Sequence, residues 1–291
     1  MPVIDGSYKF MNKGGLPLTK KPYFVPPITW SAVNRSTSFS IYPLGDSAIT
    51  IDLGNNIDEQ LNRQALAIHD WLQAHRFPGL VDIIIAYSSV SVLYDPAVVR
   101  TGKGNGPGGA YHWLKGLLEK AGGEVIGERT REGAADTRSD SSVVGHAGHG
   151  VPGHSFRIPV CYDGDYGPDQ EWIARQKGLS VEDVIRIHHS GSYRIYMVGF
   201  LPGFPYLGKV DSRLEIPRKD RPVPVMGGGV GIAGIQTGIY PLSSPGGWQI
   251  IGRTPVRLFD WHIDPPIRFQ CGDEVEFYPI SREEFLQWKN P

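Results

Sequence analysis

Two chargeable side chains, His188 and Arg218, lie in a part of the chain that is rich in glycine and proline, and each could act on a substrate. His188 shares a predicted helical face with Val184, so a hydrogen-bonded, half-buried histidine is one interpretation. Because the same helix leads toward a strand at residues 193–199, an imidazole there could alternatively move protons near neutral pH. Arg218 follows Pro217, whose fixed geometry would aim the guanidinium at a carboxylate or phosphate, with a structural ion pair as an equal alternative. We treat His188 and Arg218 as the candidate catalytic residues.

A second group of side chains is neutral or aromatic and stands among the same glycines and prolines. Gln236, Thr237 and Tyr240 supply donors and acceptors that could hold an amide or lactam, or simply satisfy backbone groups inside a barrel. The aromatic members could equally be core, although aromatic residues with arginine are typical of the centre of a protein interface. The remaining candidates for substrate or partner binding are Phe200, Pro202, Phe204, Tyr206, Trp248 and Arg253.

Two segments supply most of these residues. Residues 199–208 read GFLPGFPYLG, and residues 234–254 read GIQTGIYPLSSPGGWQIIGRT. Each proline fixes one dihedral angle and removes a donor, while glycine adopts backbone conformations that other residues avoid. Such segments predict rigid, shaped loops, which on a β scaffold are where binding sites usually lie.

The composition argues against several classes of function. Lys and Arg number 29 against 30 Asp and Glu, a net charge of −1, so no basic surface argues for nucleic acid. No run approaches the ~18 apolar residues of a membrane span, and no signal-peptide core is apparent, so we expect a cytoplasmic protein. Cys161 and Cys271 stand far apart, which is neither a disulfide framework nor a zinc site.

Other motifs suggest chemistry but lack what that chemistry requires. The glycine run at residues 227–234 lacks the Gly-Lys-Ser/Thr ending of a P-loop and a following helix, so a tight barrel turn is favoured over phosphate binding. His146, His149 and His154 have no fourth ligand nearby, and we predict no metal site. The run at residues 243–247 is superficially similar to a serine amidase loop, but no Ser/Lys partner stands at a suggestive spacing.

The first part of the chain predicts an extension and a small domain. Residues 1–38 mix Gly, Pro, Lys and Ser without periodicity and predict a flexible extension. Residues 39–122 predict a compact α+β domain, with Asn56 capping a helix that has Leu61, Ala65, Ile68 and Leu72 on one face. Strands are expected at 49–53, 81–85 and 90–94, and a second helix at 111–121. This β-α-β-β-α order suits a ferredoxin-like sandwich.

The rest of the chain predicts a linker and a barrel. Residues 123–154 are rich in Gly, Arg, Ser, Asp and His and poor in apolar residues, which predicts a flexible linker. Residues 155–291 contain many short strands separated by Gly and Pro, the pattern of a mainly β barrel. Helices are expected at 170–176, after Ser180 and after Ser281, and strands at 156–160, 194–198, 229–232, 249–251, 256–259 and 273–277.

From residue 42 to residue 277 the chain resembles the allophanate hydrolase subunit 1 family. The resemblance rests on YPLGD at 42–46, Ile187-His188, the two segments described above, Pro217-Arg218 and GDEVEF at 272–277. It implies an α+β N-terminal ferredoxin-like domain followed by a mainly β cyclophilin-like barrel domain with a helical insert. One loop departs from the family pattern, because residues 218–229 read RKDRPVPVMGGG without the usual second Pro-Arg pair.

The resemblance implies three functions that the shared motifs do not separate. The first is the B subunit of an ATP-dependent 5-oxoprolinase, which cleaves 5-oxo-L-proline to L-glutamate together with a C subunit, of the allophanate hydrolase subunit 2 type, and an A subunit. Activating the lactam would require ATP and Mg²⁺ at the level of the complex, and the isolated chain is not expected to be active. The second is a KipI-type inhibitor of a sensor histidine kinase. The third is a carboxyltransferase-like subunit related to urea carboxylase and allophanate hydrolase.

Overall fold

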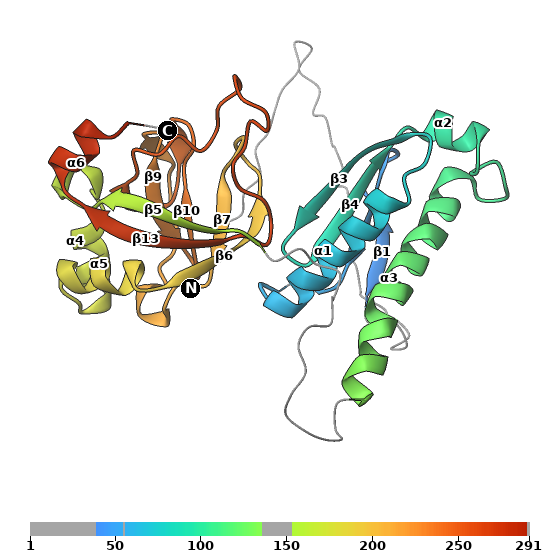
Figure 1. Ribbon diagram of the computed structural model, residues 1–291, viewed down its shortest axis with the longest axis horizontal. Helices are drawn as coiled ribbons and strands as arrows, with labels where there is room; N and C mark the ends of the chain where they lie inside the picture. Colours follow the sequence, from blue (N-terminus) through green and yellow to red (C-terminus); the bar gives the residue numbers. More distant parts are fainter. Residues whose placement is uncertain (1–38, 55, 136–152, 290–291) are drawn as a thin grey trace, which may run out of the picture. The chain divides into compact units, whose positions relative to one another are not determined.

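The computed structural model describes residues 39–54, 56–135 and 153–289 (Figure 1). The described residues form one compact unit, and the predicted extension at 1–38 lies outside them. The central part of the predicted linker, residues 136–152, also lies outside them. None of the helices in the described part of the chain is long and apolar enough to cross a membrane.

A four-stranded antiparallel sheet forms the first part of the described chain. Its strands are β1 (Ser40–Pro43), β2 (Ala48–Asp52), β3 (Leu80–Ala86) and β4 (Ser89–Tyr94), in the order β1-β2-β4-β3. Inward and outward residues alternate along β4, as the sequence pattern predicts for a half-buried strand. The three predicted strands are thus present, and the edge strand β1, too short to give a pattern, is an addition.

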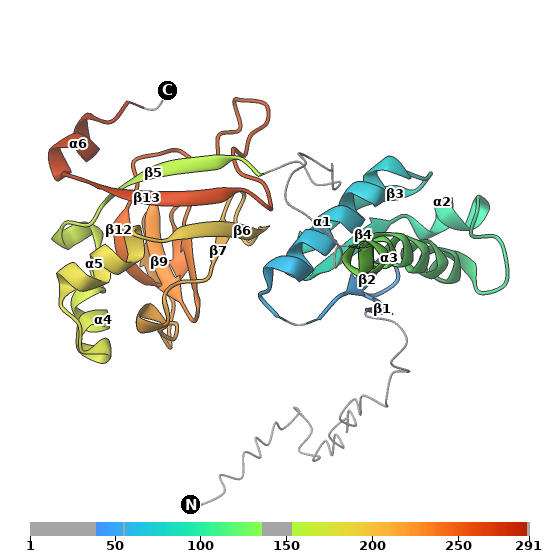
Figure 2. The same ribbon diagram turned by 60° about the horizontal axis from the view of Figure 1, so that its bottom comes forward.

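Helix α1 (Glu59–Ala74) packs on this sheet beside α3 (Gly109–Ala135) (Figure 2). It begins at Asp58, whose side chain accepts a hydrogen bond from Leu61 N at 3.0 Å, so the predicted cap at Asn56 is wrong. A carboxylate is the better cap here because the helix N-terminus carries a partial positive charge. The predicted apolar face is buried at Ala65, Ile68 and Leu72. A short helix that was not predicted, α2 (Pro96–Thr101), follows β4 and is capped by Asp95.

Helix α3 spans Gly109–Ala135 and so extends into the segment predicted to be a linker, of which residues 123–135 are helical. The glycines at 122 and 123 suggested a helix end. Gly122 is instead a position of close packing, because a Cβ atom there would lie 2.7 Å from Phe39 Cε1. Beyond it, Val125 and Ile126 pack against the core, and Trp71 Nε1 donates a hydrogen bond to Glu124 Oε2 at 2.6 Å. Tertiary contacts therefore outweigh the low helix propensity of glycine.

The adjacent glycines give a matched pair of variants. Gly123→Ala is expected to stabilise the protein by up to about 1 kcal/mol, because alanine favours the helix and no atom lies within 4 Å of the added Cβ. For Gly122→Ala, crowding against Phe39 and Ile51 should cancel or reverse that gain. Guanidinium unfolding of the two variants in parallel measures the difference. Equal stabilisation by both would contradict the close packing of α3 on β2.

A closed barrel of seven strands forms the second part, in the order β10-β7-β6-β13-β5-β12-β9. β5 and β13 run parallel to one another, with Ser155 opposite Glu274 and Cys161 opposite Ile280, and lie side by side in Figures 1 and 2. The strands are β5 (Ser155–Cys161), β6 (Ser192–Val198), β7 (Pro205–Gly208), β9 (Gly229–Ala233), β10 (Gln236–Ile239), β12 (Gln249–Arg253) and β13 (Glu274–Ile280).

One predicted barrel strand is wrong. Residues 256–259 form no strand, and only an isolated bridge pairs Phe259 with Ile267. Pro255 precedes the segment, and prolines at 265 and 266 stand beside its only partner, so donors that a ladder requires are missing. The other predicted barrel strands are present.

Short helices and a two-stranded ribbon decorate the barrel. Ser180 caps α5 by accepting from Asp183 N at 3.0 Å, and Ser281 and Glu284 form a capping box on α6, both as predicted. The three predicted helices are present as α4 (Gln170–Lys177), α5 (Val181–His189) and α6 (Arg282–Gln287). The elements that were not predicted are the 3₁₀ turns Gly164–Tyr166 and Ser212–Leu214 and the ribbon of β8 (Val223–Val225) with β11 (Ser244–Gly246).

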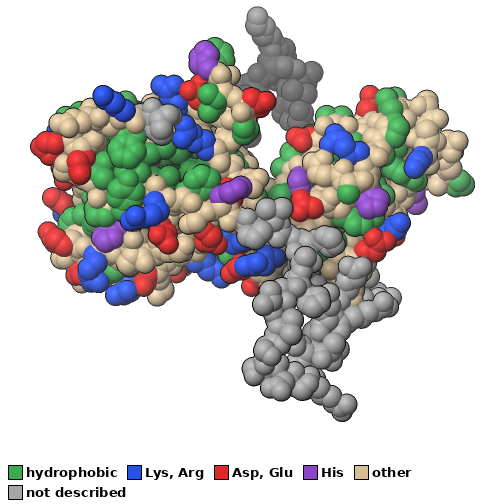
Figure 3. Space-filling model, in the orientation of Figure 1, with side chains coloured by type: hydrophobic (Ala, Val, Ile, Leu, Met, Phe, Trp, Pro, Cys, Tyr) green, Lys and Arg blue, Asp and Glu red, His purple; other side chains and the backbone are tan. Residues whose placement is uncertain are grey.

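The described residues form three apolar clusters: one under the sheet, one inside the barrel and a smaller one at the two predicted loop segments. Asn62 of α1 is fully buried, donates to the carbonyl of Tyr196 at 3.1 Å and accepts from Arg194 Nε at 3.1 Å. These bonds connect α1 with β6. On the face shown in Figure 3, hydrophobic side chains gather over the barrel among interspersed charges of both signs.

Candidate functional site

Five aromatic residues from the two predicted loop segments come together around Phe204. The ring of Phe204 lies 4.7 Å from Tyr206, 5.1 Å from Tyr240 and 5.4 Å from Trp248, measured between centroids. Phe200 lies 5.9 Å away and is 67% exposed, whereas Phe204 and Tyr240 are buried. The structure thus brings together two segments of the sequence, since Phe200 and Trp248 are more than 40 positions apart. We call these five residues the aromatic cluster.

The loop between β6 and β7 places Phe200 and Phe204 through its own hydrogen bonds. Gly199 N donates to Phe204 O at 3.0 Å, and Phe204 N donates back to Leu201 O at 3.0 Å. The loop turns at Gly203, with φ of 80°, a conformation that favours glycine. Pro202, predicted as a binding residue, is exposed at the same turn. The loop is therefore a tight, internally bonded turn, as its glycine and proline content predicts.

Arg218 is exposed, and the backbone on both sides of it is fixed. Gln249 Nε2 donates to Pro217 O at 3.0 Å, and Lys219 N donates to Gly247 O at 2.7 Å. The ion pairs of the described residues include no partner for Arg218, so its charge is available to a ligand or to another protein.

The next residue, Lys219, anchors this segment to the barrel. Its ammonium pairs with Asp169 and also donates to Trp248 O at 2.8 Å. Asp169 Oδ2 in turn accepts a hydrogen bond from Ile250 N at 2.6 Å. Because this pair is half-buried and holds the backbone of Trp248, it positions Arg218 and the aromatic cluster relative to one another.

The guanidinium of Arg218 acts electrostatically on two phenols of the cluster. Burial raises the pKa of Tyr206, and the positive charge of Arg218 opposes that rise. Burial likewise raises the pKa of Tyr240, with Arg218 again acting in the opposite direction. Both phenols are therefore protonated at neutral pH and can donate hydrogen bonds beside a fixed positive charge.

Gln236 and Tyr87 add a polar edge to the cluster. Tyr87 OH donates to Gln236 Oε1 at 3.2 Å, and its ring lies 6.0 Å from that of Tyr206. Nε2 of Gln236 is buried without a hydrogen-bond partner among the described residues, which leaves a donor for an amide or lactam oxygen. Burial raises the pKa of Tyr87 to about 12. Tyr87 was not predicted from the sequence. The structure places it in a two-residue hairpin turn with φ of 51°, a conformation that is unusual for tyrosine.

His188 lies inside the barrel rather than at the aromatic cluster. It is fully buried, with Nδ1 3.0 Å from Tyr162 OH and Nε2 2.9 Å from Thr237 Oγ1. Because the Thr237 hydroxyl donates to Gly231 O, Nε2 is the nitrogen that carries the proton and Nδ1 accepts from Tyr162. Burial, with a smaller effect of His189, lowers the pKa of His188 to about 3. This geometry fits the interpretation of a satisfied core histidine, and Thr237 belongs to the same buried network.

Arg253 is also separate from the cluster. Its Nε donates to Gly227 O at 2.8 Å, and its guanidinium lies 5.6 Å from the ring centroid of Phe285 in α6. These contacts hold the terminal helix and the turn before β9. The contacts of Arg253 are therefore structural, and none of them is with the aromatic cluster.

The motifs set aside in the sequence have ordinary structural positions. Residues 229–233 of the glycine run form the fully buried strand β9, and Ser243 Oγ accepts from Gly227 N at 3.0 Å. Of the three linker histidines only His154 lies within the described residues. Within residues 39–54, 56–135 and 153–289 no group of three or more His, Cys, Asp or Glu residues could hold a metal ion.

The protein combines an α+β part, built on a four-stranded antiparallel sheet, with a closed seven-stranded barrel that carries the aromatic cluster and Arg218. Residues 39–269 match the model of the family described as carboxyltransferase domain, subdomain C and D, and the chain belongs to this family.

Three relatives place the chain more closely. The 5-oxoprolinase B subunit of Bacillus subtilis (strain 168) is 40% identical over 252 residues, which is 86% of this chain and 97% of that protein. The 5-oxoprolinase B subunit of Escherichia coli O157:H7 is 49% identical over 125 residues, 43% of this chain and 57% of that protein. The crystal structure of TTHA0988 is 31% identical in sequence and matches with a TM-score of 0.62. The match covers 83% of this chain but only 40% of the TTHA0988 chain.

Proposed function

We propose that this chain is the B subunit of an ATP-dependent 5-oxoprolinase, which opens 5-oxo-L-proline to L-glutamate together with partner subunits. The observation that carries the proposal is the 40% identity to a 5-oxoprolinase B subunit over almost the whole of that protein. Relatives of that name are subunits of a complex, so we further propose that this chain acts with the C and A subunits of the same enzyme.

The aromatic cluster has the groups that a lactam acid requires. The carboxylate of 5-oxoproline would pair with Arg218, which has a fixed backbone and no partner of its own among the described residues. The lactam oxygen would accept from the unpaired Nε2 of Gln236 and from a tyrosine hydroxyl. The exposed ring of Phe200, backed by Phe204, would form the apolar wall against the lactam ring. We therefore place substrate contact, or contact with a partner that holds the substrate, at this site.

ATP and Mg²⁺ would act at the level of the complex. The described residues contain no cluster suited to a metal ion, and the glycine run at 229–233 is a buried strand. We therefore assign no step of phosphoryl transfer to this chain. Its own residues would bind and orient the lactam acid, and the partner subunits would supply the nucleotide site.

The architecture suits such a role. We propose that residues 39–122 are a ferredoxin-like domain, because the order β1-β2-β4-β3 reproduces that sheet with one edge strand supplied from the N-terminal side. Residues 155–291 would correspond to a cyclophilin-like barrel with α4 and α5 as the helical insert. Because α3 continues to Ala135, the first domain would extend to that residue, and the connection to the barrel would be shorter than the predicted 123–154.

Reconstitution tests the proposal. The purified chain alone is expected to form no L-glutamate from 5-oxoproline and ATP, whereas addition of the A and C subunits from the same organism should give ATP-dependent glutamate formation. Glutamate release and phosphate release are measured in parallel. Turnover by the isolated chain would contradict its dependence on partners, and a complete mixture that assembles without turnover would overturn the proposed function.

A further inference from the structure

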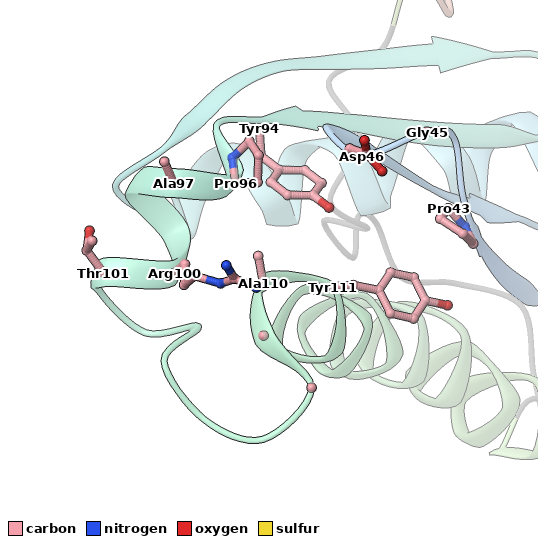
Figure 4. Close-up of a pocket in the computed structure, with 12 residues that line it drawn as sticks. Pro43, Gly45, Asp46, Tyr94, Pro96, Ala97, Arg100, Thr101, Ala110 and Tyr111 are labelled. Carbon is pink, nitrogen blue, oxygen red and sulfur yellow. The ribbon is translucent and has the colours of Figure 1, made fainter.

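A cavity of about 710 Å³ lies in the first part of the chain, between the sheet and helices α2 and α3 (Figure 4). Its volume is in the range of pockets that hold small molecules. All of its lining residues lie between positions 43 and 111, so it shares no residue with the aromatic cluster. The lining combines prolines, alanines and glycines with five polar side chains: Asp46, Tyr94, Arg100, Thr101 and Tyr111.

Tyr94 presents an unpartnered hydroxyl to this cavity. The residue is only 4% exposed, and its hydroxyl makes no hydrogen bond within the described part of the chain. Figure 4 shows its ring projecting into the space between Asp46, Ala110 and Tyr111. Burial, followed by the neighbouring Asp46 and Tyr111, raises the pKa of Tyr94, so the hydroxyl is protonated at neutral pH. The hydroxyl oxygen itself opens onto the cavity, so it can donate a hydrogen bond to a ligand there.

The two charges in the lining are opposite and not paired with one another. Arg100 stands in the last turn of α2, Asp46 lies just before β2, and no ion pair within 4.0 Å joins either to another described residue. The first residues of the long helix α3, Gly109 and Ala110, line the same wall as Arg100 and add the positive end of a helix dipole. The cavity therefore has a positive side and a separate negative side.

We propose that this cavity binds a free α-amino acid in its zwitterionic form. The carboxylate would lie between Arg100 and the Tyr94 hydroxyl near the α3 N-terminus, and the ammonium group would face Asp46. A simple anion such as phosphate would satisfy only the positive side and would meet the negative charge of Asp46. The site lies apart from the proposed substrate site, and the inference does not depend on the 5-oxoprolinase function.

Isothermal titration calorimetry on the full chain tests the proposal, with the standard protein amino acids as probes. At least one is expected to bind, and its N-acetyl derivative, the corresponding amine without a carboxylate, and inorganic phosphate should each bind at least about tenfold more weakly. Arg100→Gln and Asp46→Asn should each weaken amino-acid binding by about tenfold or more, since both side chains are exposed and neither change threatens folding. Tyr94→Phe keeps the buried ring and should weaken binding by a smaller factor.

Arg218→Gln, at the aromatic cluster, is the matched control and should leave amino-acid binding unchanged. If no amino acid binds, or if one binds equally well to the Arg100→Gln and Asp46→Asn variants, the proposal is wrong. Phosphate or the N-acetyl derivative binding as tightly as the amino acid would also overturn it, by showing an anion site instead. Loss of binding in Arg218→Gln alone would place the amino acid in the barrel and contradict the cavity.

Discussion

Replacing Arg218 with alanine is expected to lower kcat/KM of the assembled complex for 5-oxoproline by roughly 100-fold, because a fixed, charged donor on the substrate can be worth about 3 kcal/mol. Folding should be unaffected, since Arg218 is exposed and the segment around it is held by its neighbours' hydrogen bonds rather than by its side chain. The melting temperature of the purified chain and the steady-state kinetics of the complex are the two measurements. Arg218→Lys should recover only part of the activity, because an ammonium cannot reproduce the guanidinium fork.

Arg221 provides the control for this experiment. It is exposed, carries the same charge and lies three residues further along the same loop. Arg221→Ala should therefore keep most of the activity if Arg218 acts through a specific contact. Equal losses of activity in the two variants would indicate a general effect of loop charge on assembly. Normal turnover by Arg218→Ala would show that the substrate contacts lie on one of the partner proteins.

The position of the aromatic cluster could be predicted because the information is local. Glycine and proline fix the shape of a loop within a few residues, so two such segments indicate a site without knowledge of the fold. Tyr87 could not be found in the same way. It lies well over 100 residues from Gln236 in the sequence, and only the packing of the β3–β4 turn against the barrel brings the two together.

The cavity beside α2 likewise could not be predicted, because its residues come from distant parts of the sequence. Asp46 and Tyr94 are far apart in the sequence and become neighbours because β2 pairs with β4, with Ala48 opposite Leu93 and Tyr94 N donating to Ser47 O at 2.9 Å. Periodicity predicted both strands but not their pairing. The extension of α3 was missed for a related reason, because the packing of Gly122 against Phe39 is a tertiary contact that overrides propensity.

His188 illustrates what a helical face leaves undetermined. Its spacing with Val184 predicted a partly buried ring, but a periodic pattern does not distinguish a side chain at the barrel's rim from one in its core. The structure places it in the core, with both nitrogens bonded and the ring stacked 4.7 Å from Phe277. In this position the histidine makes stability depend on pH.

Lowering the pH from about 6.5 to about 4 is expected to destabilise the protein through His188. The pKa of a solvated histidine is 6.5 and that of His188 in the folded protein is about 3, so between these values only the unfolded chain binds the proton. The stabilising contribution is complete above pH 6.5 and is lost as the pH falls toward 3, by up to about 1.4 kcal/mol for each pH unit. Guanidinium unfolding at a series of pH values measures this slope.

The His188→Gln variant isolates the effect. Glutamine can still bond to Tyr162 and Thr237 but takes up no proton, so the variant should be less stable than the wild type near neutral pH and have a shallower dependence between pH 6.5 and 4. The difference in unfolding free energy between the two proteins should therefore shrink as the pH falls.

His112→Gln, at an exposed position on α3, is the matched control and should follow the wild-type slope. The pKa of Asp183 is lowered by Arg186, and that of Asp260 by the backbone N–H of His262 and then by Arg257, so both carboxyl groups titrate mainly below this window. Parallel curves for the wild type and His188→Gln would show that His188 is not the group that senses acid in this fold, and that its ring has access to solvent.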